Sequence, residues 1–281
     1  MLLKLVKYEI KASARIFLLL YPVTLIAAFV TGFFESISMN SLSGASFMNP
    51  SIVNVFSSLF TMLYSLLSMS LIVITIVVIV MRFYRLLGEG GYLWFTLPAT
   101  ATQHITSKLL VALLWSFLST IVLCLSILIL AYTADSGTFS RLLRELLDLA
   151  NRYSANLTFF FLIGSAAVVV TTLRSILTFY AAMSIGPNVM KSRFGGSALV
   201  YIGISVVLSA VSSLIAFPVS ATYAENVANS YSGYISIDQA TNIANELVMV
   251  ALVPQIAIGV IISIALFVCT NYFVSKKLNL P

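Results

Sequence analysis

Six apolar segments, each long enough to cross a lipid bilayer, constrain this chain more than any other feature. A helix needs about 20 residues to span the hydrocarbon core. Only 9% of the residues are charged, against about a quarter in a soluble domain. The sequence therefore predicts an all-α polytopic membrane protein that forms a single transmembrane domain over residues 1–281. The predicted spans are residues 16–34, 57–81, 108–132, 157–186, 197–219 and 248–274.

Basic residues gather on one side of these spans. Eleven lie in the N-terminal segment, the loops after spans two and four, and the C-terminus, with only two acids beside them. The opposite side holds three basic and seven acidic residues. By the positive-inside rule, both termini are then cytosolic. The net charge of +6 fits contact with anionic lipid headgroups and requires no nucleic-acid partner.

Residues 1–15 are expected to form an interfacial elbow helix, with apolar residues on one face and lysines on another. The external loop 133–156 contains a predicted helix over residues 141–153, with a leucine face and charges at i,i+4 spacing, such as Arg141 and Glu145. Because such pairs contribute little, burial of the leucine face on the outer leaflet or against the bundle must stabilise that helix.

A second external loop covers residues 220–247. Ser236 and Gln239 have the spacing of a capping box, in which two side chains satisfy each other's backbone amides at a helix start. This predicts a short external helix that ends near Glu246.

The cytosolic segment 82–107 has an unusual content of apolar residues for a loop. Thr100 and Gln103 form a capping box that starts the helix leading into span three. The segment also contains aromatic residues, and aromatic side chains often dominate the binding energy when they insert into a partner's groove. The alternative is that they lie in the membrane interface, where Tyr and Trp are enriched. The apolar residues concerned are Tyr92, Leu93, Trp94, Phe95 and Leu97.

The same loop resembles the corresponding loop of ABC-2 type transporter permeases, in particular the short six-span form of Gram-positive peptide and toxin exporters. The residues that carry the resemblance are Glu89, Gly90, Gly91, Tyr92, Leu93, Thr96, Leu97, Pro98, Ile105, Ser107 and Lys108. The layout of an elbow helix and six spans is similar as well. The resemblance implies a coupling helix in the loop, where Glu89, Gly91, Tyr92, Leu93, Trp94, Phe95, Leu97 and Pro98 would contact an ATPase.

The resemblance further implies a multi-pass protein of the bacterial cytoplasmic membrane that works as a dimer, with a second permease copy or a paralogue, and with two ABC ATP-binding subunits. No G-x-x-x-x-G-K-[ST] motif occurs in the chain. The chain is thus expected to be a transport subunit and not an enzyme. It would bind no cofactor itself, and ATP and Mg²⁺ would belong to the partner. The expected cargo is amphipathic or hydrophobic, and a peptide is favoured.

Arg174 is the only charged residue in the interior of a predicted span, since Lys108 only opens span three, and intramembrane charges are candidates for function. It snorkels to the inner headgroups if span four ends near Phe179. It lies near mid-membrane, in a pairing or pathway role, if the span ends near Gly186. Span two carries a hydroxyl stripe that either permits close helix packing or lines a pathway. The stripe consists of Ser58, Thr61, Ser65, Ser68 and Thr75.

Two other classes of function stay open at this point. A secondary transporter or channel would need an intramembrane relay of ionisable groups, and the spans contain no acid. A membrane scaffold without ATP coupling is the other alternative. The sequence shows no set of residues typical of a membrane-embedded hydrolase, and no metal site is predicted.

Overall fold

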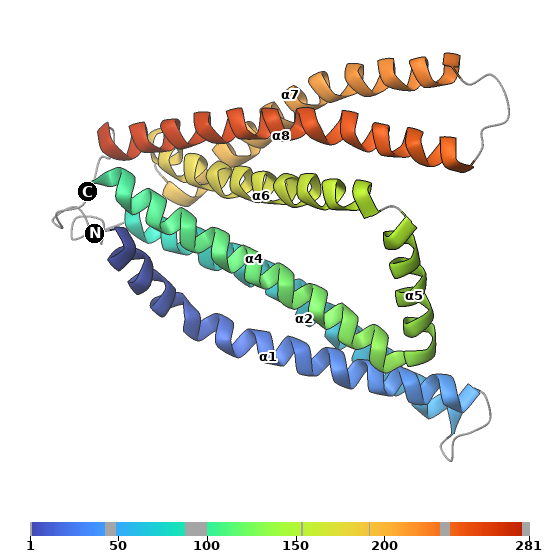
Figure 1. Ribbon diagram of the computed structural model, residues 1–281. Helices are drawn as coiled ribbons and strands as arrows, with labels where there is room; N and C mark the ends of the chain where they lie inside the picture. The colour runs from blue at the N-terminus through green and yellow to red at the C-terminus, as the bar shows by residue number, and fades with distance from the viewer. Residues whose placement is uncertain are drawn as a thin grey trace. The chain divides into compact units, whose positions relative to one another are not determined.

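The computed structural model describes residues 2–42, 49–87, 100–152, 154–190, 192–230 and 237–276, and within these ranges every regular element is a helix. Figure 1 shows their arrangement. The elements are α1 (Leu2–Leu42), α2 (Pro50–Leu87), α4 (Ala101–Ala134), α5 (Ser136–Arg152), α6 (Ser154–Ile185), the 3-10 turn η1 (Gly186–Asn188), α7 (Arg193–Ser230) and α8 (Ile237–Lys276).

Six of the described helices are long and apolar enough to cross a membrane, namely α1, α2, α4, α6, α7 and α8. Each contains one of the six predicted spans, except that Gly186, the last residue of span four, lies in η1 directly after α6. The prediction of an all-α protein with six candidate spans is therefore confirmed, and this composition indicates a multi-pass membrane protein.

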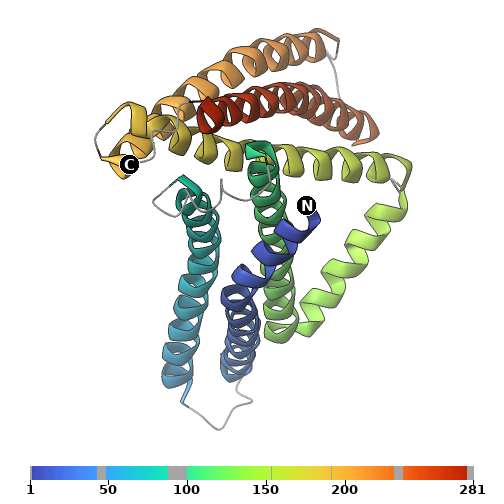
Figure 2. The same cartoon turned by 90° about the vertical axis from the view of Figure 1, so that its left-hand side faces the viewer.

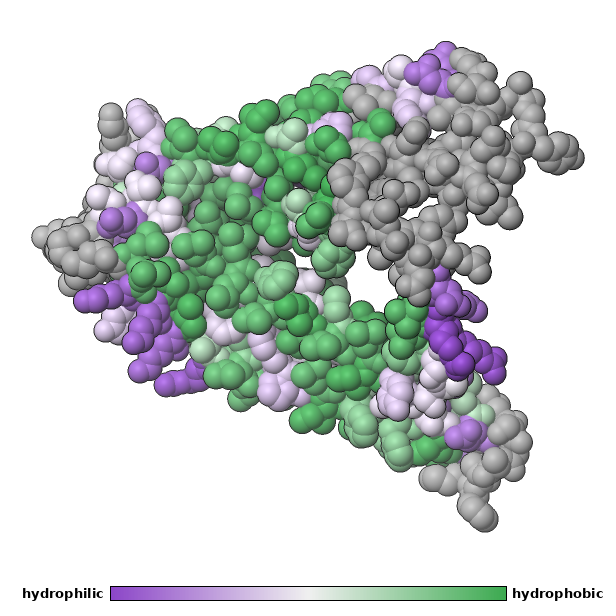
Figure 3. All heavy atoms as spheres, viewed as in Figure 1, coloured by the Kyte–Doolittle hydropathy of each residue, from purple (hydrophilic) through white to green (hydrophobic). Residues whose placement is uncertain are grey.

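The chain divides into two compact units. Unit 1 comprises Met1–Arg82 and Thr106–Ser154, and unit 2 comprises Phe83–Ile105 and Ala155–Pro281. Within unit 1, α1, α2 and α4 lie side by side, and α5 follows α4 (Figures 1 and 2). Figure 3 shows apolar side chains over these helices, between hydrophilic residues at the N-terminal end of α1 and on α5. An apolar outer surface is what contact with lipid tails requires.

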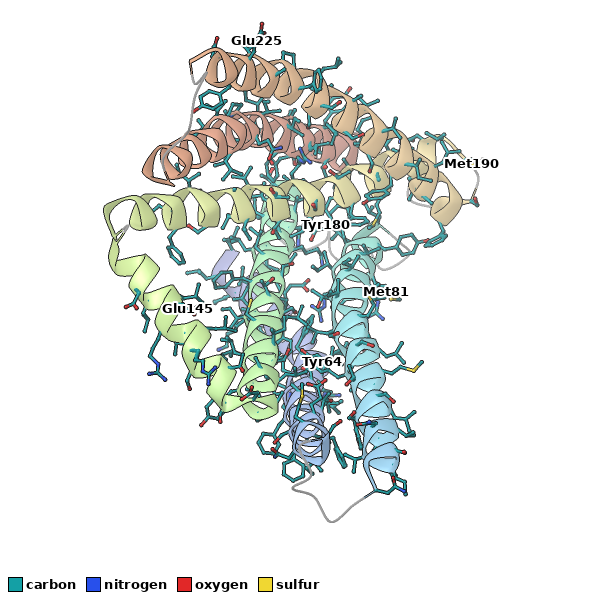
Figure 4. All side chains as sticks on the ribbon, turned by 90° about the vertical axis from the view of Figure 1, so that its right-hand side faces the viewer. Tyr64, Met81, Glu145, Tyr180, Met190 and Glu225 are labelled. Atoms are coloured by element: carbon teal, nitrogen blue, oxygen red, sulfur yellow. The ribbon has the colours of Figure 1, made fainter. Side chains whose placement is uncertain are left out.

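The packed centre of unit 1 joins α1 to α4. Phe17 stacks on Trp115 with a ring-centroid distance of 4.3 Å, and Val111 is buried beside them. A second contact of polar type lies further along, where the hydroxyl of Tyr64 on α2 is 2.8 Å from that of Ser126 on α4 (Figure 4). Because hydroxyl groups cannot stay unsatisfied in an apolar interior, such pairs fix the helices in register.

Unit 2 combines α6, α7 and α8 with the last turn of α2 and the first turn of α4. Phe83 of α2 stacks on Tyr180 of α6, which Figure 4 labels, at 3.9 Å between ring centroids. Thr102 of α4 donates a hydrogen bond to Asn271 of α8 over 3.1 Å. Both ends of the loop between α2 and α4 are therefore anchored on helices of unit 2.

Two glycines allow a tight return between α6 and α7. A Cβ on Gly186 would lie 2.4 Å from the backbone nitrogen of Ser197, and one on Gly196 would lie 2.3 Å from the carbonyl oxygen of Gly186. No side chain fits at these distances, so both positions need a residue without Cβ.

Helices continue past the predicted span boundaries. Residues 1–15, predicted as a separate elbow helix, are continuous with the first spanning helix in α1. The region 220–247 is largely helical too, because α7 runs to Ser230 and α8 begins at Ile237. The short external helix predicted there is thus the first part of α8. Ser236, the first residue of its predicted capping box, lies outside the described residues.

The external helix predicted over 141–153 is present as α5, which begins earlier, at Ser136. Asp135 caps it by accepting hydrogen bonds from the backbone amides of Gly137 and Thr138 at 2.9 and 3.2 Å. The Thr138 side chain and these amides hold the pKa of the Asp135 carboxyl below its usual range. The predicted ion pair of Arg141 with Glu145 does not form between these described side chains, which is consistent with its small expected contribution.

The leucines of α5 are exposed. Their exposed fractions are 54% for Leu142, 47% for Leu143, 62% for Leu146 and 54% for Leu147. Two coverings were expected for this leucine face, the outer leaflet or the helix bundle. The described residues do not bury the face against the bundle.

Candidate functional site

The residues predicted to contact an ATPase fall in a segment that the structure does not describe. Glu89, Gly91, Tyr92, Leu93, Trp94, Phe95, Leu97 and Pro98 all lie within residues 88–99, outside the described ranges. The described residues on either side show how the helices that precede and follow this segment are held.

The capping box at the end of this loop is confirmed. The backbone amide of Gln103 donates to the Thr100 hydroxyl at 3.4 Å, and the amide of Thr100 donates to the Gln103 side-chain oxygen at 3.3 Å. The two residues thus satisfy each other's free backbone donors at the start of α4, as the spacing predicts.

Three charged side chains from three helices meet beside the loop. Glu9 of α1 accepts a hydrogen bond from Arg82 of α2 at 2.5 Å and from Lys108 of α4 at 2.6 Å. Arg82 also donates to the backbone carbonyl of Glu9 at 2.8 Å. We call these three residues the Glu9 cluster. Arg82 precedes the loop and Lys108 follows it, so one carboxylate ties together the two helices that carry the loop.

The Glu9 cluster is largely shielded from solvent. The exposed side-chain fraction is 10% for Glu9, 6% for Lys108 and 22% for Arg82. Charges removed from water at this level cost several kcal/mol each unless they are paired and hydrogen-bonded. Each of the two cations has Glu9 as a counter-ion, so one carboxylate pairs with charges from two helices.

A hydrogen-bonded chain continues the Glu9 cluster into the packed centre of unit 1. Trp115 donates its indole N–H to the Ser13 hydroxyl at 2.8 Å, and Ser13 donates to the Glu9 carbonyl at 2.7 Å. Trp115 is the same ring that stacks on Phe17. The N-terminal part of α1 is therefore fixed on α2 and α4 through both polar and aromatic contacts.

Sequence reasoning missed the Glu9 cluster. It counted Glu9 and Arg82 only as charges that indicate orientation, and Lys108 as such a charge and as part of the loop resemblance, whereas the structure brings the three into contact. One available signal was that Glu9 is an acid within a strongly basic N-terminal segment. A carboxylate between lysines on a helix at the membrane surface is typical of a residue with a tertiary partner.

The hydroxyl stripe of span two divides into two parts. Thr75 is buried and lies 3.0 Å from the Ser119 hydroxyl of α4, which in turn lies 3.0 Å from that of Tyr21. This end of the stripe joins helices of unit 1. The other members, Ser58, Thr61, Ser65 and Ser68, donate to carbonyls of their own helix at 2.7–2.9 Å and are exposed or half-buried.

Arg174 lines a cavity of about 130 Å³ within unit 2, together with Val170, Thr171, Ser212, Gln255, Ile258 and Gly259. Its guanidinium donates to the Ser212 hydroxyl at 3.3 Å. In the described part of the chain, no carboxylate lies within ion-pair distance of it. The cavity therefore presents a positive charge that the described residues do not neutralise.

The position of Arg174 along α6 bears on the two predictions of its depth. α6 ends at Ile185, so Arg174 lies about 16 Å of helix from that end at 1.5 Å per residue. Half of a hydrocarbon core is about 15 Å thick. The helix does not end near Phe179, and Arg174 lies near mid-membrane if the end of α6 coincides with the membrane boundary, so its depth stays a prediction.

The described residues contain no group of three His, Cys, Asp or Glu side chains arranged to hold a metal ion. No protein-family model matches the chain, and no curated protein or solved structure matches it either. The argument for function therefore rests on the chain's own residues and on the resemblance of its loop.

Proposed function

We propose that this protein is the permease subunit of an ATP-driven ABC exporter, of the ABC-2 type that its loop resembles. It would form the pathway for an amphipathic or hydrophobic cargo, in the first place a peptide, and would depend on a separate ATPase. A second permease copy or a paralogue would complete the pathway, and two ATP-binding subunits would supply ATP and Mg²⁺.

One observation carries most of this proposal. Arg82 and Lys108 flank the loop, and both are ion-paired to Glu9. A loop that only rests in the membrane interface does not need buried charges to fix its ends. A loop that receives force from a partner does, because the force must reach the spanning helices instead of moving the loop alone.

The anchoring of the loop on unit 2 supports the same proposal. Phe83, at the end of α2, stacks on Tyr180 of α6, and Arg174 lies six residues before Tyr180 on that helix. A displacement of the loop would therefore act on the helix that carries the charged cavity. Alternating access requires that such a helix can adopt two discrete positions.

The same proposal places the loop in the cytosol. The distribution of basic residues gives cytosolic termini, and the N-terminal part of α1 would follow the inner leaflet as an elbow. The membrane would be the bacterial cytoplasmic membrane. Glu9 would then lie on the side where ATP is available.

A secondary transporter or channel is the second candidate, and the cavity at Arg174 is the observation that favours it. Such a protein could move an anion past this charge without ATP. In the described residues no acid accompanies Arg174 to form a proton or ion relay, and for this reason the exporter is preferred. A membrane scaffold would need neither the cavity nor the loop.

The test is affinity purification of the tagged protein from its native membranes in mild detergent, followed by mass spectrometry. We expect a stoichiometric partner with a P-loop, lost when Trp94 and Phe95 are replaced by Ala. Aromatic anchors commonly contribute 2 kcal/mol or more each, so the double variant should bind at least about 100-fold more weakly.

The matched control replaces Phe117 and Phe161, which are 61% and 75% exposed on spanning helices, by Ala. This control removes two aromatic side chains but leaves the loop intact, and it should retain the ATPase. A protein that purifies without any P-loop partner, in a preparation where other membrane complexes survive, contradicts the proposal. If the Trp94/Phe95 variant instead retains the partner, the ATPase docks at another part of the protein.

A further inference from the structure

The cavity at Arg174 has the composition of a binding site for an oxyanion. We propose that it binds the carboxylate or phosphate group of an amphipathic molecule, whose apolar part lies on the adjoining surface of unit 2. In a permease this molecule would be the cargo, and to that extent the inference rests on the proposed function. The binding itself requires neither ATPase nor transport.

The guanidinium of Arg174 has hydrogen-bonding capacity to spare. An arginine carries five N–H donors in a planar fork that matches carboxylate and phosphate oxygens. Only one of these donors is engaged among the described residues, in the bond to Ser212. An isolated cation at membrane depth is costly, and an anionic ligand supplies the missing counter-charge.

Two further polar side chains line the same cavity. Thr171 contributes a hydroxyl group and Gln255 an amide group to the lining. They come from α6 and α8, on either side of the guanidinium. Together with Arg174 they can donate to several oxygens of one ligand group, which gives the site its preference for oxyanions over halide ions.

The packing around the cavity is close, so its shape is maintained by the helices. A Cβ on Gly259 of α8 would lie 2.6 Å from Val170 of α6, so these helices approach at the cavity as only glycine permits. Pro254, next to Gln255, lies inside α8. Proline has no amide hydrogen, which leaves the carbonyl one turn earlier free and favours a bend there.

The size and surroundings of the cavity fit a headgroup and not a whole cargo. A volume of about 130 Å³ exceeds the need of a single water many times over, but it cannot hold a peptide. Thr171 and Gln255 are exposed, so the cavity is open to the outside of unit 2. Exposed apolar side chains lie on the same helices close to these residues, at Val168, Val169 and Val253.

The experiment measures binding of radiolabelled laurate to the full-length protein in phosphatidylcholine nanodiscs. Laurate and its neutral amide, dodecanamide, differ in the charged group alone. We expect saturable binding of laurate and at least about tenfold weaker binding of dodecanamide. The Arg174→Gln variant should bind laurate at least about tenfold more weakly than the wild type, as expected for loss of a charged hydrogen-bond partner.

If Arg174→Gln folds poorly, the variant Gln255→Leu and the control Ser209→Ala still test the proposal. Gln255→Leu should also weaken laurate binding, by about three- to tenfold. Ser209→Ala serves as the control, because Ser209 lies on α7 near Ser212 but donates to the Val206 carbonyl of its own helix and does not line the cavity. A thermal midpoint for each variant without ligand separates lost folding from lost affinity.

Competition distinguishes the sources of the oxyanion. Displacement of laurate by phosphatidylglycerol in the disc supports the proposal and assigns the site to a lipid or lipid-linked headgroup. Displacement by inorganic phosphate also supports it, because it shows that the cavity recognises the oxyanion group itself. Equal binding of laurate and dodecanamide, or unchanged laurate affinity in folded Arg174→Gln and Gln255→Leu proteins, overturns the proposal. None of these outcomes alters the ATPase purification described above.

Discussion

Replacement of Glu9 by Gln tests the Glu9 cluster directly. The change keeps the size of the side chain but removes its charge and replaces one of its two acceptor oxygens by an NH₂ donor. Lys108 and Arg82 would then keep their charges at a site with no carboxylate between them. We expect a marked loss of stability, together with release of the N-terminal part of α1 from α2 and α4.

The magnitude follows from burial. Lys108 is 6% exposed and Glu9 10% exposed at the side chain. Breaking a pair at this level of burial by neutralising one partner typically costs about 3–5 kcal/mol, because the other charge stays buried. Arg82, at 22% exposed, can reach solvent more easily and adds less. We therefore expect a loss of about 3 kcal/mol for Glu9→Gln.

The assay is equilibrium unfolding in mixed micelles, with Glu35→Gln as control. Glu35 lies on the same helix, but its described contact is an exposed hydrogen bond from Thr61 at 3.1 Å. Its replacement should change stability by less than about 0.5 kcal/mol. Adding Lys108→Met to Glu9→Gln should recover part of the loss, since one of the two cations that faced the lost carboxylate is removed. Equal effects of the two Glu→Gln changes, or strict additivity with Lys108→Met, would refute the reasoning.

Two further predictions concern the turn between α6 and α7 and the cap of α5. Gly196→Ala should destabilise the protein by about 1–3 kcal/mol in thermal unfolding, because its Cβ meets the Gly186 carbonyl; Gly203→Ala on the same helix, with open space around it, should be neutral or slightly stabilising. The lowered pKa of Asp135 means that its cap is intact above the unfolded-state pKa of about 3.9 and is lost as the pH falls through the lower folded-state value. Hydrogen exchange at the Gly137 and Thr138 amides should therefore accelerate relative to other α5 amides below about pH 4, and an Asp135→Asn protein should lack this pH dependence.

The spanning helices could be predicted because hydropathy and length alone determine them. Their ends could not be predicted in the same way. α2 continues to Leu87, past the end of the predicted span at Met81, and Arg82 in this extension is ion-paired to Glu9. α1 likewise begins at Leu2. Local charge indicates where a helix leaves the apolar layer of the membrane. Where the helix itself ends also depends on its tertiary contacts.

The candidate site shows the same division between local and distant information. The Thr100–Gln103 capping box was predictable because both partners lie within four residues. The contacts of Glu9 join residues separated by 73 and 99 positions, and no local pattern indicates such pairs. The surroundings of Arg174 combine three helices and could be inferred only once their packing was known.

The exposed leucines of α5 make the protein's folding free energy depend on what surrounds it. Leu142, Leu143, Leu146 and Leu147 are each about half exposed, and full burial of a leucine contributes about 1.5–3 kcal/mol. Covering all four would thus add about 3–6 kcal/mol, a large fraction of the 5–15 kcal/mol that holds a typical domain together. A lipid or detergent that covers these leucines therefore stabilises the native state much as a core residue does. The free energy of unfolding then depends on which solubilising agent is used.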